Sequence, residues 1–85
     1  MQLANVIGHA TATLKHAALT GWRLVVVQPL LADGSNDGDP WLAIDLLGSR
    51  RGDRVILSSD SQLVRRAMES QQTPVRWIVV AVVDE

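Results

Sequence analysis

The 85-residue chain is 47% hydrophobic and 20% charged, which excludes an intrinsically disordered protein and predicts one compact domain over residues 1–85. Its formal net charge of −1 at pH 7 provides no positive field, so we expect neither nucleic acid nor an anionic membrane as a partner. Without cysteine the chain has no disulfide or thiolate metal site, and its N-terminus lacks a basic segment and a long apolar run, so we expect a cytoplasmic protein without a signal peptide.

Residues 2–14 open the chain with a pattern that fits either a helix or a strand. Apolar residues at helical spacing between Leu3 and Leu14 fit an amphipathic helix, whereas the β-branched residues among them, such as Val6, favour a strand. Periodicity alone leaves both alternatives open.

The segments that follow are short and rich in Val, Ile and Leu, and they predict β-strands at residues 24–27, 41–47, 54–57 and 75–83. Gly, Pro, Asp and Ser separate these segments, as is typical of a small all-β barrel or sandwich. Residues 31–40 contain two Asp-Gly pairs and a proline, so they are predicted to form a long hairpin loop.

A short helix is predicted after the fourth strand. Residues 59–62, Ser-Asp-Ser-Gln, have the pattern of a capping box, in which a serine hydroxyl bonds a free amide of the first helical turn. Apolar residues between 63 and 68 then recur every four positions and give the segment one apolar face. Pro74 and the polar residues before it are expected to end this helix.

The last predicted strand is apolar on both faces. One face carries Val75, Trp77, Val79, Ala81 and Val83, and the other carries Arg76, Ile78, Val80, Val82 and Asp84. In a lone barrel Ile78, Val80 and Val82 would be exposed, although their burial is worth about 5–9 kcal/mol in total. We therefore predict that a partner subunit covers these three side chains; a helix or loop of the same chain is the alternative.

Nearly the whole chain resembles one known family in the order and spacing of its segments. Residues 4–21 resemble an opening strand with the pattern V-x-G-x-x-x-A-T-x-K followed by a glycine, here Val6, Gly8, Ala12, Thr13, Lys15 and Gly21. Residues 24–30, 33–34, 38–45, 47–57 and 74–84 continue the resemblance. The family is EutN/CcmL, the pentameric vertex proteins of bacterial microcompartment shells.

This resemblance implies a five-stranded OB-like β-barrel with one short helix, in which residues 2–14 form a strand. It also implies a cyclic homo-pentamer with a structural rather than enzymatic function, located in a microcompartment shell in the cytoplasm. The pentamer would cap the fivefold vertices and contact hexameric shell proteins. A small OB-like module that binds nucleic acid or another ligand is the alternative, since the chain has three tryptophans on which bases could stack but no basic excess.

One stretch contains Arg-Gly-Asp, a tripeptide that adhesion receptors read in extracellular matrix proteins. In the family this stretch resembles a glycine-rich turn, which implies that Gly52 provides backbone freedom and that Asp53 accepts hydrogen bonds from turn amides. The two arginines stand where the family has small residues, and in a ring that places this loop at its central opening they would attract anions. The predicted loop consists of Gly48, Ser49, Arg50, Arg51, Gly52 and Asp53.

Other polar residues give no pattern for a catalytic, metal or cofactor site. His9 and His16 lie seven residues apart and would point to opposite faces of a strand. The calcium-loop pattern that starts at Asp33 has Ile44 where a bidentate glutamate is required. Ser58, Ser59 and Ser61 lie near Asp60 without a histidine base, and helix capping explains them.

Asp45 and the tryptophans are assigned structural roles. Asp45 sits within a strand and is expected to hydrogen-bond nearby backbone or an arginine at a subunit contact. Trp22, Trp41 and Trp77 are expected in the core or at subunit contacts, where large rings with one polar N–H are favoured. Arg76 and Trp77 depart from the family pattern near the last strand.

Overall fold

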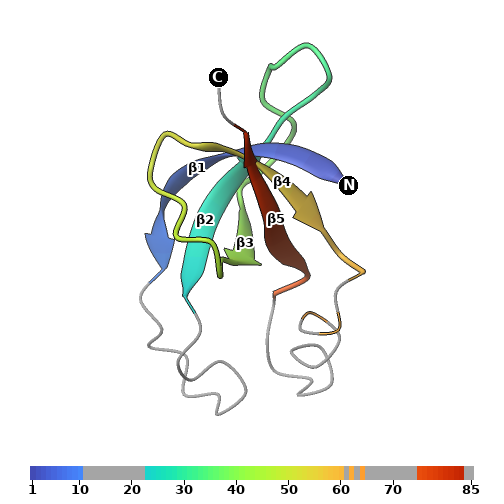
Figure 1. Ribbon diagram of the computed structural model, residues 1–85. Helices are drawn as coiled ribbons and strands as arrows, with labels where there is room; N and C mark the ends of the chain where they lie inside the picture. The colour runs from blue at the N-terminus through green and yellow to red at the C-terminus, as the bar shows by residue number, and fades with distance from the viewer. Residues whose placement is uncertain (11–22, 61, 63, 65–74, 84–85) are drawn as a thin grey trace.

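Five β-strands curl into a barrel in the computed structural model, which describes residues 1–10, 23–60, 62, 64 and 75–83 (Figure 1). The segment 2–14, left open between helix and strand, is a strand in its described part. The strands are β1 (Gln2–Ala10), β2 (Leu24–Pro29), β3 (Trp41–Ile44), β4 (Arg54–Ser58) and β5 (Trp77–Val83).

The strand order β1-β2-β3-β5-β4 is closed by pairing between β1 and β4, which confirms the predicted five-stranded barrel. Only the contact between β3 and β5 is parallel, and every other neighbouring pair is antiparallel. This order, with β5 between β3 and β4, is that of an OB-like barrel. Residues 31–40 connect β2 to β3 as the predicted long hairpin loop and project from one end of the barrel (Figure 1).

The predicted helix falls mostly outside the described residues. Of its positions the structure describes Gln62 and Val64, and both are helical. Before them, the Asp60 amide donates to Ser58 Oγ at 3.1 Å. The capping role of Ser59 stays a prediction. In the part of the chain that the structure describes, no helix is long and apolar enough to span a membrane.

Alternating residues of all five strands fill the inside of the barrel. In β2 and β4 the inward positions are two residues apart, as the pleat of a strand requires. None of these side chains exposes more than 2% of its surface, so the barrel is a packed core rather than a channel. The interior residues are Ala4, Val6, Val25, Val27, Ala43, Val55, Leu57 and Val79.

A second apolar cluster corrects the prediction for Ile78. We expected this side chain to be exposed in a single chain, but it is only 6% exposed. It packs with Leu24, Ile44, Val64 and Val75, so other segments of the same chain cover it. The periodicity of the strand gave no information about which segments cover Ile78.

A bulge in β5 also changes the predicted faces. Leu57 pairs with Val79 and Ile56 with Ala81, so Val80 is an extra residue between two ladder positions. One extra residue reverses the alternation of side chains relative to the partner strand. Val80 and Val82 are 43% and 37% exposed, as predicted for a single chain, but they do not continue the face of Ile78 in strict alternation.

Candidate functional site

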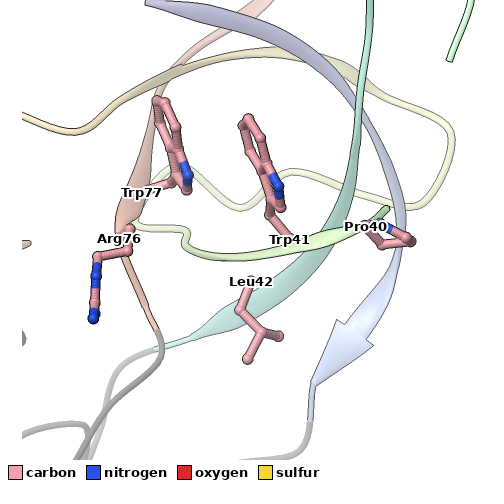
Figure 2. Close-up of a pocket in the computed structure, with 5 residues that line it drawn as sticks. All are labelled: Pro40, Trp41, Leu42, Arg76 and Trp77. Atoms are coloured by element: carbon pink, nitrogen blue, oxygen red, sulfur yellow. The ribbon is translucent and has the colours of Figure 1, made fainter. Parts of the chain in front are cut away.

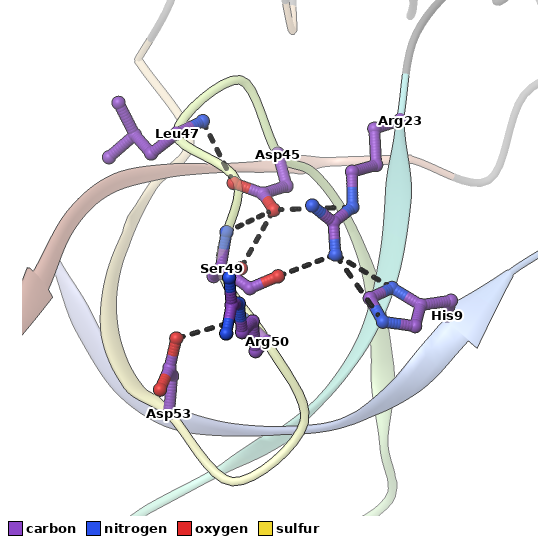
Figure 3. Close-up of polar contacts among 7 residues, drawn as sticks. All are labelled: His9, Arg23, Asp45, Leu47, Ser49, Arg50 and Asp53. Carbon is purple, nitrogen blue, oxygen red and sulfur yellow. Dashed lines mark hydrogen bonds and ion pairs between the residues drawn. The ribbon is translucent and has the colours of Figure 1, made fainter.

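A buried carboxylate organises the turn that follows β3. Asp45 is 1% exposed, and its Oδ2 accepts hydrogen bonds from the Ser49 amide and the Ser49 hydroxyl, each at 2.8 Å (Figure 3). Its Oδ1 accepts the Leu47 amide at 3.0 Å. Asp45 therefore bonds nearby backbone, as predicted, and three donors fix the path of residues 45–49. The prediction that Asp45 lies within a strand over 41–47 is wrong, because β3 ends at Ile44.

The arginine that pairs with Asp45 comes from the same chain rather than from a neighbouring subunit. Arg23 Nε lies 3.7 Å from Asp45 Oδ2, and the Arg23 guanidinium also donates to the Ser49 carbonyl. Arg23 Nη2 further contacts the ring of His9, 3.1 Å from Nδ1 and 3.3 Å from Nε2. Figure 3 shows this arginine reaching from the start of β2 to both the turn and β1.

Sequence reasoning missed Arg23, although the strand pairing contains a signal for it. The ladder joins Leu24 to Ile44, so the residues immediately outside it, Arg23 and Asp45, must be neighbours. The Asp45 amide donates to the Arg23 carbonyl at 2.9 Å, which continues the pairing by one residue. If the register between the two strands of the predicted hairpin had been known, it would have placed Arg23 opposite Asp45.

The Arg-Gly-Asp tripeptide ends a hydrogen-bonded turn. Asp53 Oδ2 accepts the Arg50 amide at 2.8 Å, and the Asp53 amide donates to the Arg50 carbonyl at 2.9 Å. Gly52 adopts φ of 95°, a conformation that side chains rarely allow. Gly52 and Asp53 also exchange backbone hydrogen bonds with Val6, each at 2.8 Å, so the turn is attached to β1.

Within that turn, Arg50 and Arg51 are exposed, whereas Ser49 is buried. A hollow of about 280 Å³ lies beside Arg51 and Gly52 and is also lined by Asn5, Val6 and Ile7. The position of this loop relative to an opening or to a neighbouring subunit stays a prediction.

Two tryptophans stack where β3 and β5 meet. The ring centroids of Trp41 and Trp77 are 4.6 Å apart and the rings are 2° from parallel (Figure 2). Both are half-buried and pack against the interior core, whereas Trp22 lies outside the described residues. An open cavity of about 420 Å³ lies beside them, and we call it the Trp cavity. Its lining is Pro40, Trp41, Leu42, Arg76 and Trp77.

The residues considered for metal binding are engaged in local structure. Asp33 Oδ1 accepts the Ser35 amide at 2.8 Å and the Ser35 hydroxyl at 2.6 Å. These two bonds, the hydroxyl first, lower the pKa of the Asp33 carboxyl below its usual value. Across residues 1–10, 23–60 and 75–83, no three His, Asp or Glu side chains gather as metal ligands would, and His16 lies outside the description.

Comparison with known proteins gives end-to-end similarity. A family described as "Ethanolamine utilisation protein EutN/carboxysome" matches residues 1–84. The shell vertex protein EutN of Salmonella typhimurium strain LT2 is 38% identical over 85 residues, covering 100% of this chain and 85% of that protein. The carboxysome shell vertex protein CcmL of Thermosynechococcus vestitus is 33% identical over 84 residues, covering 99% and 84%.

Solved structures show the same similarity in three dimensions. The pentameric microcompartment shell protein GrpN of Rhodospirillum rubrum superposes with a TM-score of 0.78 at 30% identity, covering 100% of this chain and 94% of that one. CcmL of Nostoc sp. PCC 7120 superposes with a TM-score of 0.77 at 30% identity, covering 99% and 89%. The similarity thus covers the whole barrel in both sequence and structure.

Proposed function

The chain belongs to the EutN/CcmL family, and from this membership we infer that it is a structural vertex subunit of a bacterial microcompartment shell. The resemblance stated from its sequence is confirmed. The observation that carries the function is the end-to-end match to shell vertex proteins, one of which has a solved structure described as pentameric. A shell location agrees with the cytoplasmic location expected from composition.

The function is geometric rather than catalytic. A flat sheet of hexagonal units has no curvature, and pentagons inserted at the corners supply the curvature that closes it into a polyhedron. We propose that five copies of this barrel form that pentagon and that its outer edges contact hexameric shell proteins. The most buried carboxylate described, Asp45, is committed to holding a turn, which is a structural role.

Two surfaces are proposed to act in the ring. Val80 and Val82 on β5 are proposed to contact a neighbouring subunit, because exposed valines gain stability when a partner removes them from water. Ile78 is no longer included, because the chain itself covers it. The loop from Gly48 to Asp53 is proposed to face the central opening, where five copies of Arg50 and Arg51 would create a positive ring that attracts anions.

The first test is the native mass of the purified protein at low and at moderate salt. Five chains of 9.3 kDa give about 46.5 kDa. A stable species at this mass supports the pentamer, and co-expression with hexameric shell proteins should then give closed particles. A monomer of 9.3 kDa that retains single-stranded nucleic acid would contradict the vertex function and favour an OB-like binding module.

A further inference from the structure

A closed ring of five subunits requires two different surfaces on each subunit, because one surface of each copy meets the other surface of the next. The described residues offer two features for such a contact. One is the Trp cavity, and the other is a pair of exposed leucines, Leu46 and Leu47, which we call the leucine knob. We propose that the leucine knob of one subunit inserts into the Trp cavity of its neighbour; this rests on the pentamer in the proposed function.

The two side chains of the leucine knob are strongly exposed for apolar residues. Leu46 and Leu47 are 55% and 53% exposed, more than every other large hydrophobic residue among those described except Met1. They are consecutive residues and follow the end of β3 at Ile44. Adjacent exposed leucines on a soluble subunit are typical of a contact that another chain covers.

The knob is also held rigidly, which favours docking. The Leu47 amide is bonded to Asp45, and the next anchored residue, Ser49, is fixed by both Asp45 and Arg23 (Figure 3). The turn therefore loses little conformational freedom when it docks, so little of the contact energy is spent on ordering it. Hydrogen bonds within the chain thus fix the backbone of the leucine knob in the single subunit.

The Trp cavity has the size and lining to receive such a group. Its volume of about 420 Å³ lies within the range of about 300–1,000 Å³ typical of protein pockets that bind small molecules. Figure 2 shows the two parallel indoles with Leu42 below them and Arg76 at the side. The indoles pack against the barrel core and against each other, so the cavity wall is preformed.

The cavity shares strand β5 with the other residues proposed for subunit contact. Trp77 lies on β5, the strand that carries the exposed Val80 and Val82. A neighbour seated on the Trp cavity would meet the same strand. The leucine knob follows the end of β3 and is not part of the cavity lining, so one subunit offers two different features for such a contact.

Truncation of the knob is the first experiment. The double variant Leu46→Ser, Leu47→Ser is expected to lose the 46.5 kDa species at a protein concentration where the unmodified chain is fully assembled, with association weakened at least tenfold. The matched control is Leu31→Ser, because Leu31 is also a 46% exposed leucine but lies in the hairpin loop. Far-UV circular dichroism must show the barrel spectrum for both variants.

Cross-linking between copies is the second experiment, and the absence of natural cysteine makes it selective. Leu47→Cys chains are assembled with Arg76→Cys chains and treated with a short bis-maleimide. Covalent dimers are expected from the mixture but not from either variant alone, and not when Ala32→Cys replaces Leu47→Cys. Because each chain has one thiol, a link within a chain is excluded.

The outcomes separate the two proposals. A 46.5 kDa species that forms normally in the serine double variant, or that gives no covalent dimer in the mixture, overturns the knob and cavity contact but leaves the vertex function standing. A monomeric unmodified chain overturns both. Loss of assembly in the serine variant, together with specific cross-linking, supports the contact.

Discussion

The carboxylate of Asp45 binds both the amide and the hydroxyl of Ser49, each at 2.8 Å, in a buried environment. Hydrogen bonds to a charged acceptor are about twice as strong as those between neutral groups. The Asp45 amide makes the last backbone hydrogen bond to the β2 side, and beyond it the Asp45 side chain binds the amides of the turn. The shape of the turn from β3 to β4 therefore depends on one negative charge.

Replacing Asp45 with asparagine is expected to destabilise the protein by about 2–3 kcal/mol, because the new amide group places donors opposite donors and removes the charge that faces Arg23. Urea unfolding followed by tryptophan fluorescence, at one fixed protein concentration, measures the loss. Asp37→Asn is the control, since Asp37 is an exposed loop residue. Equal stabilities of the two variants would show that the turn does not depend on the Asp45 charge.

Replacing Gly52 with alanine is expected to cost about 1–2 kcal/mol, because φ of 95° is strained for any residue with a Cβ. No atom lies within 4 Å of the added Cβ, so backbone strain alone would cause the loss. Gly8→Ala is the matched control: its Cβ also meets nothing within 4 Å, and its φ is not positive. Its change should stay below about 0.5 kcal/mol. Equal losses in chemical denaturation would contradict the strain argument.

Replacing Ser35 with alanine is expected to raise the pKa of Asp33 toward its usual value, because the hydroxyl bond is the largest cause of the lowered pKa. A lowered pKa in the folded state stabilises the fold above the unfolded-state pKa, and this contribution is lost as the pH falls through the folded-state pKa. In the Ser35→Ala variant, Asp33 should contribute less to stability, and this contribution should be lost at a higher pH than in the unmodified protein. NMR titration of the Asp33 carboxyl measures the shift, and Ser59→Ala should leave it unchanged.

Replacing Trp77 with phenylalanine is expected to remove the exciton signal of the Trp41–Trp77 stack from circular dichroism, because coupling requires two indoles. Stability should fall by about 1–2 kcal/mol, and by about 3 kcal/mol or more for Trp77→Ala, since the ring packs on the core. Trp22→Phe is the control and should keep the signal. A signal that survives in Trp77→Phe would assign the coupling to another pair.

Much of the fold was predictable because its strands have strong local signals. Four apolar segments bounded by turn residues predicted β2 to β5, and the resemblance to the family's glycine-rich turn implied the acceptor role of Asp53. The N-terminal strand could not be identified from periodicity, because the same apolar spacing fits two structures. There the family resemblance supplied the answer, and pairing of β1 with both β2 and β4 explains it physically.

The sequence by itself determined which residues are apolar, where the chain turns and to which family the barrel belongs, because these depend on local spacing and composition. Only the tertiary structure decided what each face meets. Ile78 is covered because Val64 and Leu24 reach it from distant segments, and Arg23 meets Asp45 because of the register between β2 and β3. Long-range packing and register are set by the whole barrel, so the leucine knob and the Trp cavity became visible only once the strands had closed.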